Sequence, residues 1–158
     1  MVSVPFLGGC ACGAIRYECT APPLYMGNCH CRDCQRETGS AFAPTIGVAA
    51  TALTITQGEP KYHTVTADSG NPVRRGFCPE CGSRLFGDAA TWPDFVTINA
   101  GSLDDPSWYR PTIDIWTVRA QPWEYMNPAI PKFPHQPTEE EMNKVLSTQQ
   151  EDISCPAS

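Results

Sequence analysis

The chain has 158 residues, a length typical of one domain, and its formal net charge is −6 at pH 7. The acidic balance argues against a general nucleic-acid binder, and no apolar run approaches the roughly 20 residues that span a membrane. The first residues lack the basic and apolar regions of a signal peptide. We therefore expect a cytoplasmic protein with reduced cysteines and with neither a nucleic-acid nor a membrane partner.

Short segments rich in β-branched and aromatic residues recur between Gly, Pro and Asp residues. Such segments predict strands, and their spacing indicates a mainly β fold, either a sandwich or a bent-sheet domain. With 16 prolines the fold would be rich in loops, and bound metal would supply part of its stability. The predicted strands cover residues 14–19, 43–48, 53–56, 61–66, 73–77, 84–86, 95–100 and 111–118.

One short helix is predicted after Pro137. Thr138 would cap it, and Glu141 would complete a capping box. Its apolar stripe would consist of Met142, Val145 and Leu146. We expect the Pro-rich segment 121–137 to wrap the domain surface in an extended form.

We therefore divide the chain into a zinc-binding domain, residues 1–135, and a tail, residues 136–158. The tail would contain the short helix. Its end, residues 147–158, is expected to be disordered.

Seven of the nine cysteines fall into three tight groups. A structural zinc site takes four protein ligands, whereas a catalytic site commonly takes three and leaves a position for water or substrate. Seven cysteines therefore predict one closed and one open site, with two zinc ions per chain. A disulfide framework is disfavoured by the odd number of cysteines and by the expected reducing compartment. The groups are Cys10 with Cys12, then Cys29, Cys31 and Cys34, then Cys78 with Cys81.

The closed site is expected to combine the first and last groups. In an extended chain Cys10 and Cys12 point to the same side, so both sulfurs can reach one metal ion. Cys78 and Cys81, followed by Gly82, have the pattern of a zinc knuckle. Together the two segments would supply four thiolates to a structural zinc and join the start of the domain to its middle. The spacing leaves an exchange of partners between the two sites open.

The open site is predicted at Cys29, Cys31 and Cys34, which we place on a single short loop. Its fourth position could be taken by water, a substrate thiol, Cys19 or a histidine. His30 lies between two ligands and is expected to point away from the metal, so a supporting or surface position is favoured over ligation.

The remaining histidines and cysteines are given ordinary roles. His63 is expected in a strand and His135 in the Pro-rich tail, both as surface or core residues. Cys19 would be a small buried apolar residue, and no role is expected for Cys155.

Six of the eleven basic residues are arginines near the cysteine segments. They could balance the anionic zinc–thiolate centres through ion pairs, or they could bind a carboxylate of the substrate. The sequence does not decide between the two. The arginines are Arg16, Arg32, Arg36, Arg74, Arg75 and Arg84. Asp104 and Asp105, before Pro106, are expected to build a turn.

Four stretches of this chain resemble the glutathione-dependent formaldehyde-activating enzyme (Gfa) family, also called the centromere protein V family. They are Gly-Cys-Ala-Cys-Gly at residues 9–13 with Arg16 and Tyr17, Asn-Cys-His-Cys-Arg-Asp-Cys-Gln-Arg-Glu-Thr-Gly-Ser-Ala-Phe at 28–42, Phe-Cys-Pro-Glu-Cys-Gly-Ser at 77–83, and Ala-Gly-Ser-Leu-Asp-Asp-Pro at 100–106. The resemblance covers roughly residues 5–125 and makes the first domain Gfa-like.

The resemblance implies a β-tent fold, as in small-GTPase chaperones. It implies a structural zinc on Cys10, Cys12, Cys78 and Cys81 and a catalytic zinc on Cys29, Cys31 and Cys34. The implied activity is that of a zinc-dependent carbon–sulfur lyase or synthase. Such an enzyme joins glutathione and formaldehyde into S-hydroxymethylglutathione or cleaves an adduct of this kind, so glutathione is a candidate co-substrate and the partner a small-molecule thiol.

Two other functions are weighed against the enzyme. A non-enzymatic interaction module of the same β-tent fold would have two filled metal sites and an exposed apolar patch. A zinc-ribbon nucleic-acid module is disfavoured by the acidic balance and by the order of the cysteine motifs. The missing fourth ligand at Cys29, Cys31 and Cys34 favours the enzyme.

Overall fold

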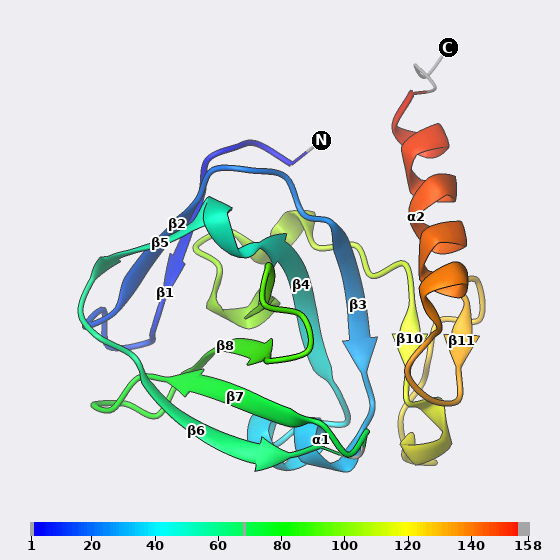
Figure 1. Ribbon diagram of the computed structural model, residues 1–158, viewed down its shortest axis with the longest axis horizontal. Coiled ribbons are helices and arrows are strands. Elements are labelled where there is room, and N and C mark those ends of the chain that lie inside the picture. Colours follow the sequence, from blue (N-terminus) through cyan, green and yellow to red (C-terminus); the bar gives the residue numbers. More distant parts are fainter. Residues whose placement is uncertain (1, 68, 155–158) are drawn as a thin grey trace.

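The computed structural model describes residues 2–67 and 69–154. These residues form two β-sheets and two α-helices, joined by short 3-10 turns, which confirms the predicted mainly β fold. Figure 1 shows the sheets side by side, with the second helix beside the last two strands. In the described part of the chain no helix is long and apolar enough to cross a membrane. Cys155 lies outside the described residues.

The smaller sheet is antiparallel and contains three strands in the order β1-β2-β5. Its strands are β1 (Phe6–Gly9), β2 (Arg16–Cys19) and β5 (Leu53–Gln57). The hairpin between β1 and β2 carries the first cysteine pair. This sheet thus presents two of the predicted metal ligands at one end.

The larger sheet has the order β11-β10-β3-β4-β9-β8-β7-β6. β10 lies parallel to β3 and β11, and the other neighbours are antiparallel. Figure 1 shows β3 and β4 running steeply across the direction of β6 and β7, so this sheet is strongly bent. Its strands are β3 (Tyr25–Cys29), β4 (Ala43–Ala49), β6 (Lys61–Thr66), β7 (Pro72–Phe77), β8 (Arg84–Ala89), β9 (Phe95–Asn99), β10 (Asp114–Ile115) and β11 (Lys132–Phe133).

The main hydrophobic core receives side chains from both sheets. Tyr17 of β2 meets Phe86 of β8 edge to face, with ring centroids 5.2 Å apart. Ile46 of β4 and Ile98 of β9 are fully buried in the same cluster. Because Cys10 and Cys78 also belong to this cluster, the first metal-ligand set sits at the edge of the core.

The predicted strands are confirmed in place, with one marked exception. The segment 111–118 forms only the two-residue strand β10, after which Trp116 adopts a left-handed backbone conformation with φ of 58°. The 3-10 turn Thr117–Arg119 follows. Three strands were not predicted. β1 ends in two glycines and β3 contains Gly27 and Asn28, which have low strand propensity, and the two-residue β11 lies in the Pro-rich segment that we expected only to be extended.

The second helix, α2 (Glu139–Ser154), begins as predicted. Thr138 Oγ1 accepts a hydrogen bond from the Glu141 amide, and the Glu141 carboxylate accepts one from the Thr138 amide. Met142 is half-buried and Val145 buried, whereas the side chain of Leu146 lies outside the described residues. The helix also includes residues 147–154, which we expected to be disordered, so it is longer than predicted.

The first helix, α1 (Arg32–Thr38), corrects the prediction that the second cysteine group lies on a loop. Its N-cap is Cys31, whose sulfur accepts a hydrogen bond from the Cys34 amide, and Gly39 ends it with φ of 66°. Cysteine is not among the usual capping residues, and the helix has no apolar stripe. Both facts explain why the sequence pattern did not indicate it.

Gly47 of β4 allows two aromatic rings to stack over the backbone beside the second cysteine group. Tyr25 and Phe95 lie nearly parallel with centroids 5.5 Å apart, and a Cβ atom on Gly47 would come within 2.3 Å of both rings. We expect Gly47→Ala to lower the free energy of unfolding by about 1–3 kcal/mol, as overpacking does. Urea denaturation followed by fluorescence measures this change.

The matched control is Gly101→Ala. Gly101 has an ordinary φ, and an added Cβ would meet nothing closer than 3.4 Å. Its midpoint should stay near that of the unchanged chain. Equal midpoints for the two variants would show that the stacking of Tyr25 on Phe95 does not require glycine at position 47.

Candidate metal centres and the adjoining cavity

The first candidate metal centre consists of Cys10, Cys12, Cys78 and Cys81, whose sulfurs all lie within 4.8 Å of one another. The structure therefore brings together the two segments that the sequence paired. Cys10 and Cys12 sulfurs are 3.5 Å apart, and Cys12 and Cys78 sulfurs are 3.8 Å apart. A tetrahedral zinc with bonds of about 2.3 Å would place its sulfurs about 3.8 Å apart. The donor set and its spacing thus fit zinc.

Backbone turns fix the sulfurs of this four-cysteine cluster. The Ile15 amide donates to the Cys10 sulfur at 3.2 Å, and Gly82, with φ of 75°, closes the turn after Cys81. Ser83 joins the two segments, because its hydroxyl accepts from the Ala11 amide at 3.0 Å and lies 3.2 Å from the Cys81 sulfur. The hydrogen bond from Ser83 lowers the pKa of Cys81 to about 5. Sequence reasoning missed this role of Ser83.

The second candidate metal centre consists of Cys29, Cys31 and Cys34, whose sulfurs also lie within 4.8 Å of one another. Cys29 ends β3, Cys31 caps α1 and Cys34 lies in its first turn. The end of a strand and the first turn of a helix thus fix the positions of the three sulfurs. Zinc again fits the donor set, since thiolates are zinc ligands and catalytic zinc sites commonly have three protein ligands and an open position.

Electrostatics make this three-cysteine cluster a site for a cation. Hydrogen bonds from Cys29 and Cys34 lower the pKa of Cys31 to about 2. The contact with Cys31 raises the pKa of Cys29 to about 12, and contacts with Cys29 and Cys31 raise the pKa of Cys34 well above its ordinary value. The three thiols thus oppose one another's ionisation. A metal cation would let all three ionise, because a coordinating thiol loses its proton.

In the described ranges 2–67 and 69–154, no fourth Cys, His, Asp or Glu side chain joins the three-cysteine cluster. Cys19 is fully buried in the core, as expected of a small apolar residue, and its thiol donates to the Ala21 carbonyl at 3.5 Å. His63 packs edge-on against Phe77, and His135 against Trp116. Neither Cys19 nor a histidine of the described residues joins the cluster, so water and a substrate thiol remain of the four expected candidates for the open position.

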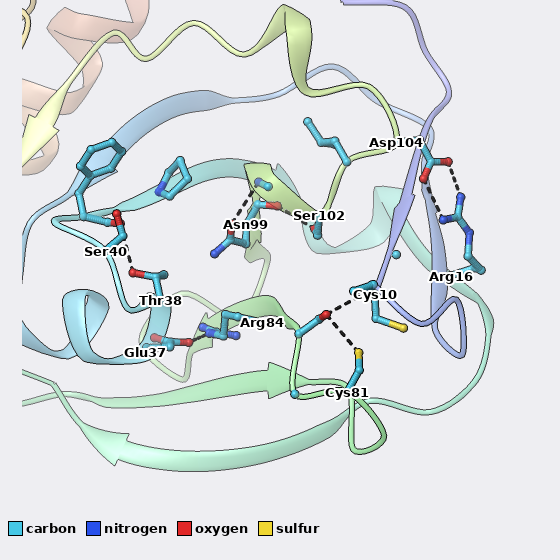
Figure 2. Close-up of a pocket in the computed structure, with 18 residues that line it drawn as sticks. Cys10, Arg16, Glu37, Thr38, Ser40, Cys81, Arg84, Asn99, Ser102 and Asp104 are labelled. Atoms are coloured by element: carbon cyan, nitrogen blue, oxygen red, sulfur yellow. Dashed lines mark hydrogen bonds and ion pairs between the residues drawn. The ribbon is translucent and has the colours of Figure 1, made fainter.

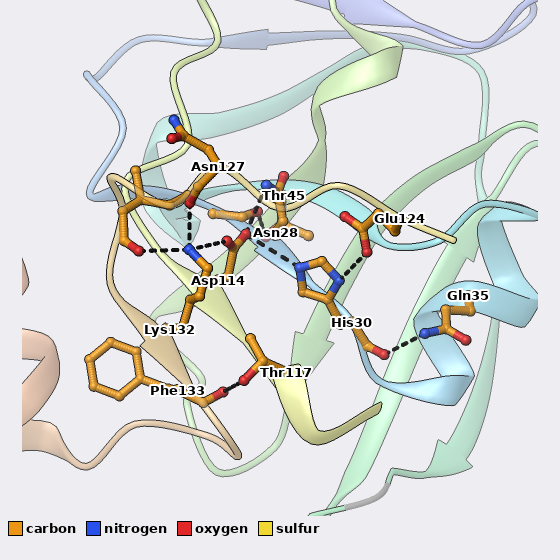
Figure 3. A network of polar contacts seen from close by, with 12 residues as sticks. Asn28, His30, Gln35, Thr45, Asp114, Thr117, Glu124, Asn127, Lys132 and Phe133 are labelled. Atoms are coloured by element: carbon orange, nitrogen blue, oxygen red, sulfur yellow. Dashed lines mark hydrogen bonds and ion pairs between the residues drawn. The ribbon is translucent and has the colours of Figure 1, made fainter. Parts of the chain in front are cut away.

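His30 is fully buried and lies between two carboxylates (Figure 3). Its Nδ1 is 2.9 Å from Glu124 Oε2, and its Nε2 is 3.3 Å from Asp114 Oδ1. Although burial opposes ionisation of Asp114, hydrogen bonds from His30 and Asn28 hold the pKa of that carboxyl below its ordinary value. Both ring nitrogens are thus occupied away from the sulfurs, which agrees with a supporting position. The sequence did not indicate the two acidic partners.

The three-cysteine cluster opens into a cavity of about 200 Å³. The large sheet supplies most of its wall, including Ile115 of β10, and Trp116 and Gln136 line it from outside the strands. Polar groups face the cavity from β4 and β9, namely Thr45, Thr97 and Asn99. The cavity therefore combines an apolar lining with a few polar groups, as small-molecule sites do.

A larger groove of about 760 Å³ adjoins this cavity. Figure 2 shows Cys10, Cys81 and the Arg16–Asp104 ion pair at one end of the groove and Glu37 with Arg84 at the other. Groove and cavity share Glu37, Thr38, Arg84 and Asn99 as lining residues. A molecule lying in the groove could therefore extend a group toward the three-cysteine cluster.

Ion pairing accounts for most of the arginines near the cysteines. Arg16 pairs with Asp104, Arg74 with Asp88, and Arg75 and Arg84 share the single carboxylate of Glu37. Arg32 donates to Gln35, and Arg36 lines a separate groove beside α1. Asp105 builds the expected turn by accepting from the Ser107 amide at 2.9 Å. Because two guanidinium groups share one carboxylate, a positive charge remains at the cavity wall.

Known proteins similar to this chain support a family assignment. A family model described as glutathione-dependent formaldehyde-activating enzyme (GFA) matches residues 5–119. A Halomonas elongata protein provisionally named a glutathione-dependent formaldehyde-activating enzyme is 30% identical over 101 residues, which span 61% of this chain and 64% of that protein. This chain thus covers less than two thirds of that relative.

A Rhodobacter sphaeroides protein of known crystal structure has a similar fold. Its TM-score against this chain is 0.52 at 18% identity, over 80% of this chain and 98% of the other. The family match extends over most of the chain and includes all seven residues of the two cysteine clusters. This protein belongs to the GFA family.

Proposed function

We propose that this protein is a zinc-dependent carbon–sulfur lyase or synthase that acts on the adduct of a thiol, such as glutathione, with formaldehyde or another electrophile. The observation that carries the proposal is the three-cysteine cluster, which lacks a fourth side chain among the described residues and faces a cavity. The family and the name of the Halomonas elongata relative support the same chemistry. We assign the bent sheet and its smaller partner to the β-tent fold.

The two metal centres would have different tasks. Cys10, Cys12, Cys78 and Cys81 would hold a structural zinc, and Cys29, Cys31 and Cys34 a catalytic one. Bound there, zinc supplies a Lewis-acid position at which a substrate thiol ionises near neutral pH. In the synthetic direction a carbon–sulfur bond forms between that sulfur and the aldehyde carbon, and the proton lost by the thiol ends on the aldehyde oxygen. Cleavage is the reverse.

The chain's own residues would orient the two reactants. The excess positive charge of Arg75 and Arg84 over Glu37 suits a carboxylate of the thiol substrate. Asn99 accepts from the Gly101 amide through Oδ1, which leaves its Nδ2 group able to donate to the hydroxyl oxygen of the adduct. The groove beside Cys10 and Cys81 is large enough for the remainder of a peptide-like thiol.

The interaction-module alternative has some support, since Val118, Trp123 and Tyr125 are exposed apolar side chains. It also requires both metal centres to be filled by side chains, whereas three sulfurs of the second centre border open volume. The enzyme proposal therefore fits better. It includes a small-molecule thiol as the partner, in line with the family, and a cytoplasmic location, where cysteines stay reduced.

Zinc content gives the first test of the proposal. Protein purified without chelator should contain two zinc ions per chain, because the two clusters supply four and three thiolates. Elemental analysis against protein concentration measures this ratio. A stable value of one, or the visible spectrum of an iron–sulfur cluster, would contradict the assignment of the two centres.

Substitution should separate the two centres. Cys78→Ser or Cys81→Ser should lower the thermal midpoint by about 10 °C or more, because a structural zinc contributes folding free energy. Cys31→Ser or Cys34→Ser should lower the thermal midpoint less, but should abolish formation of the glutathione–formaldehyde adduct. If both pairs unfold the protein equally, the second centre is structural as well.

Binding of glutathione tests where the substrate sulfur lies. Calorimetry should show glutathione binding about tenfold or more tightly than S-methylglutathione, because only the free thiol can ionise and ligate a metal. Cys31→Ser should remove this difference. Equal affinities for the two compounds in the unchanged protein would place the sulfur away from the three-cysteine centre.

A further inference from the structure

Trp116 is the largest side chain that lines the cavity of the three-cysteine cluster. It directly follows β10, whose parallel pairing with β3 places Ile115 opposite Cys29. Trp116 and the three cysteines thus line the same cavity.

The backbone of Trp116 is held in an unfavourable conformation. Its φ of 58° is the one positive value found for a non-glycine residue in the described part of the chain. A bulky residue avoids this region unless surrounding contacts impose it, and such residues cluster at functional sites. The direction of the Trp116 side chain is therefore kept at a cost in conformational free energy.

Several contacts impose this conformation. The His30 amide donates to the Ile115 carbonyl at 3.0 Å, just before Trp116, and the Arg119 amide donates to the Trp116 carbonyl at 2.9 Å. The indole meets the His135 ring edge to face, with centroids 5.3 Å apart. The Gln35 side-chain amide of α1 donates to the carbonyls of His30 and Arg119. The turn after Trp116 is thus tied to the same segment that carries the cysteines.

The His30 ring adds a second tie between the cysteine segment and the tail. Figure 3 shows it between Asp114, which precedes Trp116, and Glu124, which follows it. Lys132 approaches the other oxygen of Asp114 at 3.6 Å. The ring thus links both sides of Trp116 to the cysteine segment, through a hydrogen bond to Asp114 and a 2.9 Å contact between Nδ1 and Glu124 Oε2.

We propose that Trp116 is a specificity-determining residue, whose side chain limits the size of the group carried next to the substrate sulfur, and that the His30–Glu124 contact is a positioning contact for it. This inference rests on the proposed function, because it assumes that a thiol sulfur occupies the open position at Cys29, Cys31 and Cys34. The chemical class favoured is an adduct with a small aldehyde. Bulky electrophiles would collide with the indole.

The test uses the full chain loaded with cobalt in place of zinc, because thiolate binding to cobalt changes its visible absorption. Ethanethiol and 2,2-dimethylpropane-1-thiol are titrated, two primary thiols that differ in bulk beside the sulfur. The unchanged protein should prefer ethanethiol. Trp116→Ala should reduce this preference about tenfold, as expected when space for a few methyl groups is created, and Trp116→Phe should give an intermediate ratio.

Trp123→Ala is the matched control. Trp123 lies seven positions further along the chain, is 71% exposed and does not line the cavity, so its removal should leave the preference unchanged. Glu124→Ala should reduce the preference in the same direction as Trp116→Ala. Glu124→Gln should restore it, because its side chain has the same size and keeps a polar atom against His30 Nδ1.

The outcomes separate the inference from the proposed function. If both thiols bind and Trp116→Ala leaves their ratio unchanged, Trp116 does not set specificity, whereas the thiol site stands. If neither thiol alters the cobalt spectrum of the unchanged protein, the proposed function is wrong and the inference is wrong with it. If Glu124→Ala keeps the original ratio, or Glu124→Gln fails to restore it, the positioning contact is disproved.

Discussion

Repulsion between neighbouring thiolates is the constraint on which this structure depends. Seven sulfurs are gathered into two clusters within which all distances stay below 4.8 Å. Within the three-cysteine cluster the sulfurs compete for ionisation, since their contacts lower the pKa of Cys31 and raise that of Cys29. A cation removes this conflict and turns close packing of sulfurs into a stabilising arrangement.

The two clusters also differ in what surrounds them. The four-cysteine cluster joins the hairpin of the small sheet to the turn between β7 and β8, so it holds two sheets together with a complete set of donors. The three-cysteine cluster is built on one sheet and one helix, and its open position faces a cavity that Arg75 and Arg84 line. This contrast supports our proposal that the four-cysteine cluster stabilises the fold and the three-cysteine cluster binds the substrate.

The sequence predicts each cysteine motif well because ligand spacing within a motif is a local property, whereas the pairing of Cys10 and Cys12 with Cys78 and Cys81 rested on the number of ligands and on the family resemblance. The strands also followed from their β-branched and aromatic residues, except where glycines and Asn28 obscured β1 and β3. Helix α1 was missed because a cysteine caps it. Partners such as Glu124 for His30, or Glu37 for two arginines, come from segments far apart in the chain, so no local pattern announced them. The division of the chain at residue 135 remains a prediction.

The two clusters differ in how much of the chain must exist before each is complete. Cys12 and Cys78 are 66 positions apart, yet their sulfurs lie 3.8 Å from each other. The other cluster is complete within one strand end and the first turn of the following helix. During synthesis on the ribosome, the short-range cluster is therefore available for metal long before the long-range one. A metal ion could therefore bind the three-cysteine cluster first, and the four-cysteine cluster only after Cys81 has been added to the chain.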